Sequence, residues 1–165
     1  MKVLKWLDDN FEKTICILLM SSMTSIIFLQ FVMRRVFNNS LPWSEELARY
    51  LFIWLIYIGI SYGAKMKSHI KLELAVVKLP AKIQPFFVIL AELLFLGFAL
   101  FIVYFSWEVV QRQIFLGQTS PAMRLPMSVV YAAPMVGFFL ASIRQIQVIV
   151  LYVKDLFRKD KEVRS

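Results

Sequence analysis

The stretch ICILLMSSMTSIIFLQFVM, from Ile15 to Met33, contains 19 residues and no charge. A helix of this length, at about 1.5 Å per residue, reaches about 28 Å and can cross the hydrocarbon core of a membrane. Lys13 precedes it, and Arg34 and Arg35 follow it. A secretory signal peptide is the competing interpretation, but the apolar run is too long and no small-residue cleavage site follows. We therefore predict an uncleaved first transmembrane helix.

The composition of the whole chain points to lipid as the main solvent. Of its 165 residues 59% are hydrophobic and 18% are charged, and the mean hydropathy is +0.67. Soluble domains carry about 25% charged residues. Three further apolar segments follow the first, at about 47–64, 86–107 and 125–150. We expect an all-α membrane protein with four transmembrane helices, at about 15–33 and these three segments, in one domain spanning 1–165.

The segment between the second and third apolar runs is too polar to span a membrane. Its apolar residues recur at helical spacing, and Lys71, Lys78 and Lys82 fall together on the other side. This pattern predicts a short amphipathic helix at about 69–80 that lies in the membrane interface, with the three lysines toward lipid headgroups. The alternation from Ile70 to Leu74 would also fit a strand, but the chain offers it no partner strand.

The distribution of basic residues predicts the orientation. Thirteen lysines and arginines lie in the N-terminal segment, the middle loop and the C-terminal tail, against four (Arg34, Arg35, Arg112 and Arg124) in the other two loops. Basic residues accumulate on the cytoplasmic side. We expect both termini and the middle loop to be cytoplasmic.

The sequence contains no set of residues that is typical of an enzyme active site. The net charge of +8 comes from short runs that flank apolar segments, so it does not indicate nucleic-acid binding. Cys16 is the only cysteine and His69 the only histidine. They cannot form a cysteine pair or the paired axial ligands of a membrane cytochrome. We predict that the chain is not an enzyme and holds no cofactor or metal.

Four charged residues lie in or near the predicted spans. Counting along the helices places Glu92 and Arg144 in the cytoplasmic third, and Arg49 and Glu108 near the outer boundary. The structural interpretation is two interhelical ion pairs, Glu92 with Arg144 and Arg49 with Glu108, or side chains that snorkel to the membrane surface. The functional interpretation is a proton or substrate path. We favour ion pairs, because transport paths place charges near the middle of the membrane.

The two outer loops, 34–43 and 112–125, carry arginines, aromatic residues and a Pro-Trp turn. Such a surface suits docking of a charged soluble protein, and ordinary interfacial anchoring explains it equally well.

Two motifs resemble the small membrane subunit of tripartite ATP-independent periplasmic (TRAP) transporters. The first is Arg34-Arg35-Val36-Phe37 with Ser40 and Trp43-Ser44-Glu45-Glu46-Leu47-Ala48-Arg49-Tyr50, followed by Gly59 and His69-Ile70. The second is Ser120-Pro121-Ala122-Met123-Arg124-Leu125-Pro126, followed by Tyr131, Pro134, Gly137 and Arg144. The similarity covers nearly the whole chain. One departure is Lys71, which stands where members of the family often carry an acid.

The resemblance implies a role in the bacterial inner membrane. In that family a periplasmic binding protein delivers a carboxylate-bearing solute, such as sialic acid or a C4-dicarboxylate. A large multi-helix subunit then carries the solute inward by an elevator-type motion driven by sodium. The small subunit widens the static scaffold of the large one and offers part of the outer surface to the binding protein. By this resemblance the docking residues would be Arg34 first, then Arg35, Glu45, Glu46 and Arg124. Sodium coupling would belong to the large partner.

Two alternatives from other classes remain. One is a self-sufficient small transporter or channel that works as a homo-oligomer. The other is a membrane enzyme or redox subunit, for which Cys16 and His69 would be poor ligands. Solute flux through the chain alone would favour the first, and a coloured cofactor on purification would favour the second.

Overall fold

The computed structural model consists, in the part that it describes, of long helices joined by short loops. It describes residues 2–67 and 83–164, and the side chains of 10–66 and 83–154. The helices are α1 (Lys2–Val36), α2 (Pro42–Lys67), α4 (Gln84–Leu116) and α5 (Met127–Arg164). The predicted interfacial helix at 69–80, with Lys71, Lys78 and Lys82, lies outside the described residues.

Each described helix contains a segment long and apolar enough to cross a membrane. The segments are Asn10–Val36, Pro42–Met66, Gln84–Leu116 and Met127–Lys154, with mean hydropathies from 1.4 to 2.8. For residues 2–67 and 83–164 the prediction of an all-α protein is confirmed, and the four segments support the prediction of a multi-pass membrane protein. The helices extend beyond the predicted apolar runs, because helical hydrogen bonding continues into polar flanks that hydropathy does not count.

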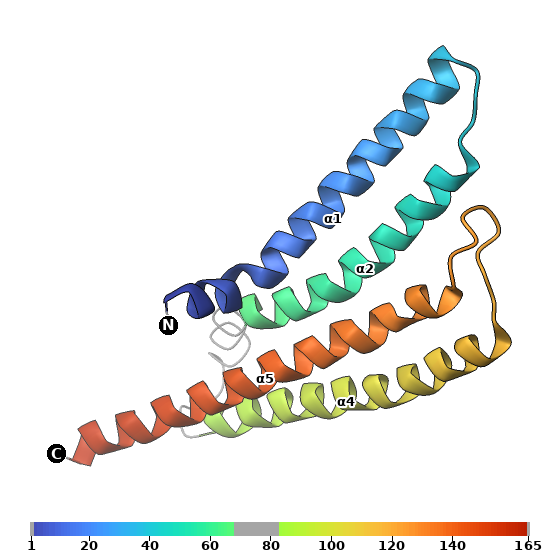
Figure 1. Cartoon of the computed structure of the whole chain (residues 1–165). Coiled ribbons are helices and arrows are strands. Elements are labelled where there is room, and N and C mark those ends of the chain that lie inside the picture. Colours follow the sequence, from blue (N-terminus) through green and yellow to red (C-terminus); the bar gives the residue numbers. More distant parts are fainter. Residues whose placement is uncertain (1, 68–82, 165) are drawn as a thin grey trace.

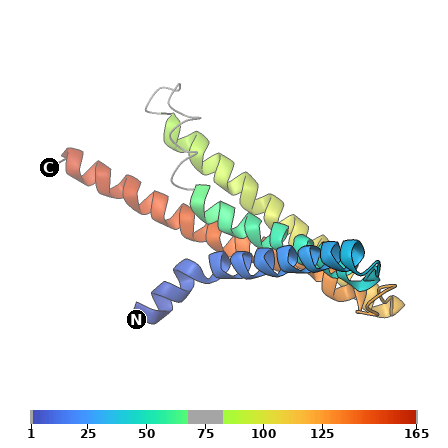
Figure 2. The same cartoon turned by 90° about the horizontal axis from the view of Figure 1, so that it is seen from above.

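The helices lie side by side in the order α1, α2, α5, α4 (Figures 1 and 2). α2 packs against both α1 and α5, and α4 packs on α5. α1 and α4 are therefore the edges of the arrangement, and both leave large apolar side chains uncovered. Phe28 of α1 and Leu94 of α4 are each 67% exposed. Such surfaces require lipid or another membrane protein around them.

The central pair, α2 and α5, is held together by a close backbone contact at Gly137. A Cβ atom added at Gly137 would lie 2.5 Å from the carbonyl oxygen of Tyr57 and 2.6 Å from its Cβ. The ring of Tyr57 packs on Phe138, with ring centroids 6.1 Å apart, and Phe138 packs on Phe98 of α4 at 5.8 Å. Small residues at helix crossings let backbones approach closely in membranes. Gly137 and this aromatic cluster thus join three of the helices.

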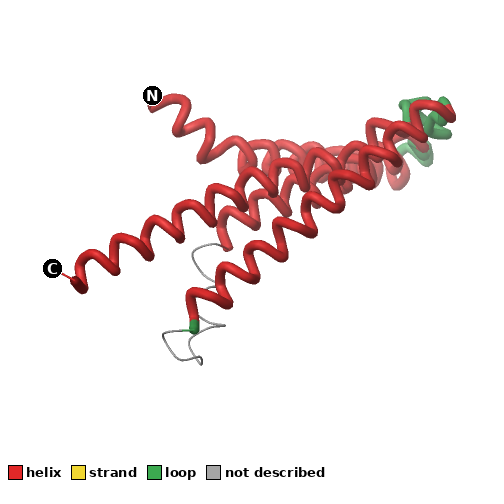
Figure 3. The backbone as a smooth tube through the Cα atoms, turned by 90° about the horizontal axis from the view of Figure 1, so that it is seen from below, coloured by secondary structure: helices red, strands yellow, loops and turns green. Residues whose placement is uncertain are grey.

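The connections α1–α2 and α4–α5 lie at one end of the molecule, and the two termini lie at the opposite end (Figure 3). We call the first the loop end and the second the terminal end. The residues that the sequence marks as docking candidates all belong to the loop end.

Candidate functional site

The loop between α4 and α5 is a compact, internally hydrogen-bonded turn. Gly117 ends α4 in the left-handed region, with φ of 60°. The N–H of Ser120 donates to the carbonyl of Leu125 at 2.8 Å, and the N–H of Arg124 donates to the carbonyl of Ser120 at 3.1 Å. The hydroxyl of Ser120 accepts from the N–H of Leu125 at 3.1 Å. The sequence Ser-Pro-Ala-Met-Arg therefore folds into one defined turn.

Glu46 of α2 fixes this turn to the rest of the molecule. Its Oε2 accepts the N–H groups of Ala122 at 2.8 Å and Met123 at 3.1 Å, and its Oε1 accepts the hydroxyl of Tyr50. Two successive N–H groups aimed at one anion form a favourable electrostatic cradle. Glu46 is only 8% exposed, although the sequence predicts a docking residue there. It positions the α4–α5 turn from inside the protein.

A second polar cluster joins α1 to α2 at the loop end. The side-chain amide of Gln30 donates to Glu45 Oε1 at 2.9 Å, and the hydroxyl of Ser44 donates to the side-chain oxygen of Gln30. Ser44 also donates to the carbonyl of Leu41 at 2.7 Å. α2 begins at Pro42, a favoured residue in the first turn of a helix, so Ser44 lies within the first turn. Both connecting loops are thus tied to α2.

These clusters leave four of the five predicted docking residues on the surface. Arg34, Arg35, Glu45 and Arg124 are exposed. Arg124 is held in the left-handed region, with φ of 55°, by the turn that Glu46 supports. The loop end therefore presents three arginine side chains on a fixed backbone.

An open cleft of about 710 Å³ lies beside these loops, between the outer halves of α2 and α5. Glu45, Arg49 and Ile56 line it from α2, and Tyr131 and Pro134 line it from α5. Its wall changes from charged near the loops to apolar deeper in the membrane span.

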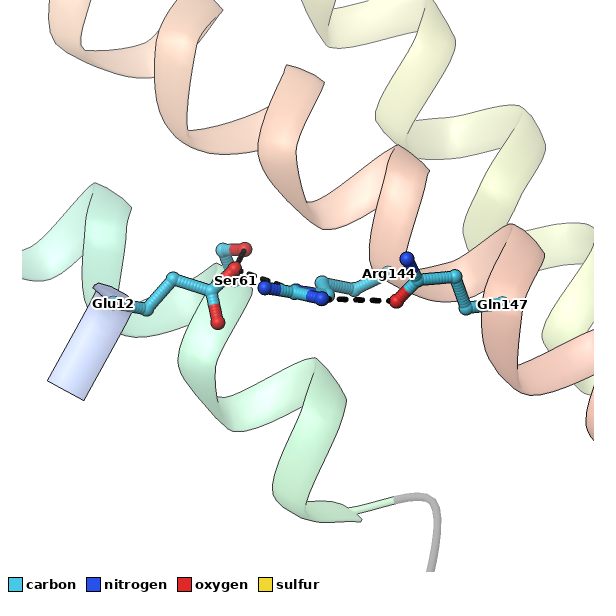
Figure 4. A network of polar contacts seen from close by, with 4 residues as sticks. All are labelled: Glu12, Ser61, Arg144 and Gln147. Atoms are coloured by element: carbon cyan, nitrogen blue, oxygen red, sulfur yellow. Dashed lines mark hydrogen bonds and ion pairs between the residues drawn. The ribbon is translucent and has the colours of Figure 1, made fainter. Parts of the chain in front are cut away.

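A buried polar network joins α1, α2 and α5 toward the terminal end (Figure 4). Glu12 Oε1 accepts Arg144 Nε at 2.8 Å and the hydroxyl of Ser61 at 3.0 Å. Arg144 also donates to the side-chain oxygen of Gln147 at 3.0 Å. Glu12 is 2% exposed and Arg144 is 7% exposed. Within the described residues, Glu12 Oε2 is buried without a hydrogen-bond partner. Such a pair is costly to break, because either charge alone would be buried uncompensated.

Residues 23–155 match the family described as "Tripartite ATP-independent periplasmic transporters, DctQ component". The chain belongs to this family. The DctQ components are the small subunits of TRAP transporters, as the resemblance of the two sequence motifs implies.

Several named relatives support the TRAP assignment. The sialic acid TRAP transporter small permease protein SiaQ of Vibrio cholerae is 29% identical over 161 residues, which cover 94% of this chain and 89% of the relative. The isethionate TRAP transporter permease protein DctMQ of Oleidesulfovibrio alaskensis is 31% identical over 151 residues, 88% of this chain but 24% of that protein. The C4-dicarboxylate small permease protein DctQ of Vibrio cholerae is 27% identical over 100 residues, 61% of this chain and 43% of the relative. The chain thus spans about a quarter of the isethionate protein.

The predicted ion pairs of this TRAP small subunit need correction. The structure pairs Arg144 with Glu12 of α1 and places Glu92 against the side-chain amide of Gln145. Arg144 and Gln145 are adjacent in α5, so their side chains point about 100° apart around the helix. Arg144 therefore faces α1 and α2, whereas Gln145 faces α4. Arg49 and Glu108 are both exposed, and no ion pair joins them in the described part of the chain. Their helices, α2 and α4, are separated by α5.

Sequence reasoning also missed four polar residues of the TRAP small subunit. They are Glu12, Gln30, Ser61 and Gln145. Glu12 lies before the apolar run, so it reads as a flank charge beside Lys13. α1 begins at Lys2, so Glu12 lies within the helix and inside the bundle. Extension of the predicted helix toward the N-terminus would have identified Glu12 as a candidate buried residue. The other three are uncharged, and only their neighbours reveal their role.

Proposed function

We propose that the chain is the small scaffold subunit of a sodium-coupled secondary transporter that imports a carboxylate-bearing solute. A periplasmic binding protein would deliver the solute, and a large multi-helix membrane subunit would carry it and couple it to sodium. The small subunit would widen the scaffold of the large one and contribute to the docking surface. Membership of the TRAP family supports this role, and the match to part of the longer protein DctMQ agrees with it.

The observation that carries the docking role is the Glu46 cradle. Glu46 is a buried carboxylate that holds the backbone of Ala122 and Met123. Such an anchor fixes the turn that bears Arg124, at the same end of the molecule as Arg34 and Arg35. Exposed arginines on a rigid backbone suit an acidic protein surface, since little side-chain and loop entropy is lost on binding. We assign the first contact to Arg34 and weaker contacts to Arg35, Glu45 and Arg124.

The proposed orientation places the loop end in the periplasm and both termini in the cytoplasm of a bacterial inner membrane. It rests on the thirteen basic residues of the N-terminal segment, the middle loop and the C-terminal tail, against four in the other two loops.

The substrate class rests on the relatives alone. Their names specify isethionate, sialic acid and C4-dicarboxylates, at 31%, 29% and 27% identity. All three are organic anions, and the similar identities give no preference among them. Sialic acid and C4-dicarboxylates carry carboxylates, whereas isethionate carries a sulfonate, so the three names together support an organic anion. We assign selectivity to the partner proteins, and we propose the carboxylate class on the strength of the sialic acid and C4-dicarboxylate relatives.

The first test is a mild-detergent pull-down on the tagged chain expressed with its neighbouring genes. We expect a larger polytopic protein to co-purify near one to one. A lone chain that runs as a homo-oligomer, and that passes solute by itself in liposomes, would replace this proposal with the small-transporter alternative.

The docking role is tested separately by uptake into liposomes that hold the whole membrane complex. With binding protein limiting, Arg34→Glu should slow uptake, and excess binding protein should recover it. Lys154→Glu is a matched control, because Lys154 is also an exposed cation but lies in α5 away from the loop end. Unchanged uptake by Arg34→Glu at limiting binding protein would remove Arg34 from the docking surface.

A further inference from the structure

One face of α2 carries a regular row of exposed and half-buried residues, of which Glu45 at one end is hydrogen-bonded to Gln30 of α1. The row, which we call the α2 seam, consists of Glu45, Arg49, Phe52, Ile56, Gly59, Gly63 and Met66. The steps along it alternate between four and three residues. This spacing keeps side chains on one face and is the pattern by which two helices pack along their length. Phe52, Ile56 and Met66 are 48%, 44% and 52% exposed.

The two glycines of the seam are not explained by packing inside the chain. A Cβ added at Gly59 or Gly63 would meet no atom within 4 Å, whereas one at Gly137 would collide with the backbone of Tyr57. Glycine weakens a helix interior relative to alanine, and two glycines four residues apart form a surface that lets another helix approach closely. Gly97 of α4 also faces open space, but it has no second glycine four residues away. The pairing of Gly59 with Gly63 in one row, without a packing role inside the chain, favours a close partner helix outside this chain.

The outer half of the seam opens into the cleft described above. Glu45, Arg49 and Ile56 belong to both, and the cleft of about 710 Å³ widens the contact toward α5. Arg49 lies within a membrane span, is exposed and has no ion pair in the described part of the chain. A charge in that position favours a complementary acid on whatever covers it.

The length of the seam identifies the kind of partner. From Glu45 to Met66 it extends about 32 Å at 1.5 Å per residue, close to the full hydrocarbon thickness of about 30 Å. A surface peptide would not cover it. In the relative DctMQ, the segment similar to this chain is part of a polypeptide about four times as long as the segment. In that relative, the remaining polypeptide is covalently linked to the similar segment and is therefore held close to it.

We infer that the α2 seam is the surface on which a transmembrane helix of the large subunit packs, with an acidic residue near its periplasmic end facing Arg49. This inference rests on the proposed function and specifies its interface. It requires close helix contact at Gly59 and Gly63, and it distinguishes α2 from the apolar edge helices α1 and α4.

The test uses the complex purified through the tagged chain. Gly59→Ile combined with Gly63→Ile should reduce the recovered large subunit by about tenfold or more, because two branched side chains separate the helices. Gly97→Ile is the matched control, since Gly97 is exposed in α4 and its Cβ would also meet open space. The control should recover the large subunit as the unmodified chain does.

A second measurement does not depend on the variants' folding. A photo-reactive phenylalanine analogue at Phe52 of the seam should cross-link to the large subunit, and the same group at Leu94 of α4 should not. If the unmodified chain recovers no large subunit, the proposed function itself fails. If the chain recovers it but Phe52 cross-links only to lipid or to a second copy of this chain, the seam inference fails and the proposed function stands.

Discussion

Replacement of Gly137 by alanine tests whether the α2–α5 contact holds the protein together. The added methyl carbon would lie 2.5, 2.6 and 2.7 Å from the carbonyl oxygen, Cβ and carbonyl carbon of Tyr57. Ordinary contacts of this kind occur at about 3.5 to 4.0 Å. Two of the three atoms are backbone atoms of α2, so a side-chain rotation cannot relieve the collision. The two helices must separate by about 1 Å at this point.

The expected free-energy change has two opposing parts. Alanine strengthens a helix relative to glycine by up to about 1 kcal/mol. Overpacking of a close contact costs about 1 to 3 kcal/mol. Gly97→Ala gains the first without the second, because its Cβ meets open space. We therefore expect Gly137→Ala to be about 1 to 3 kcal/mol less stable than Gly97→Ala.

Reversible unfolding in mixed detergent micelles measures this difference on the purified chain. Fluorescence of Trp54 in α2 gives a local signal when the other three tryptophans are replaced by phenylalanine. The separation should also weaken the aromatic cluster of Tyr57, Phe138 and Phe98. Equal stability of the two variants would refute the reasoning, because it would mean that α2 and α5 are not in backbone contact at Gly137.

Three further predictions concern the polar clusters. Glu46→Ala should speed amide hydrogen exchange at Ala122 and Met123, because their two N–H groups lose a charged acceptor. The same variant should slow uptake at limiting binding protein. Glu45→Ala, at the exposed neighbouring residue, should leave the exchange at Ala122 and Met123 unchanged. Arg144→Met should cost about 3 to 5 kcal/mol, since it leaves Glu12 buried and uncompensated, and adding Glu12→Gln should restore part of the loss in the same unfolding assay. Additive losses would show that the two side chains do not interact. Glu92→Gln should cost less than about 1.5 kcal/mol, because the amide oxygen can still accept from Gln145, and a larger loss would indicate an ionic partner for Glu92.

The transmembrane segments follow from hydropathy because lipid imposes a simple condition on each segment by itself. A run such as 15–33 must be helical, since every backbone group has to be satisfied within the segment. The lateral order of the helices carries no such local signal. Glu92 and Arg144 lie at similar depths, but the choice of partner depends on which faces of α4 and α5 meet.

The sequence predicts which residues belong to the candidate site, but it does not predict which contacts these residues make. The motif residues Glu45 and Glu46 are adjacent, yet one is exposed and the other is buried under the α4–α5 turn. In the sequence the family resemblance marks both as docking residues. Only the approach of a loop 76 residues away gives Glu46 its role. Glu12 was missed for the same reason, because its partner Arg144 is 132 residues away.

That separation has a consequence for how the protein is made. Ribosomes add about 5 to 20 residues per second, so roughly 7 to 26 seconds pass between synthesis of Glu12 and of Arg144. During that interval the first helix enters the membrane with an acid that has no cation to meet. A chain truncated before α5 keeps this unmatched acid permanently. Until α5 is made, Glu12 therefore lacks the cation that compensates its charge in the finished fold, and unfinished molecules carry this local defect in α1.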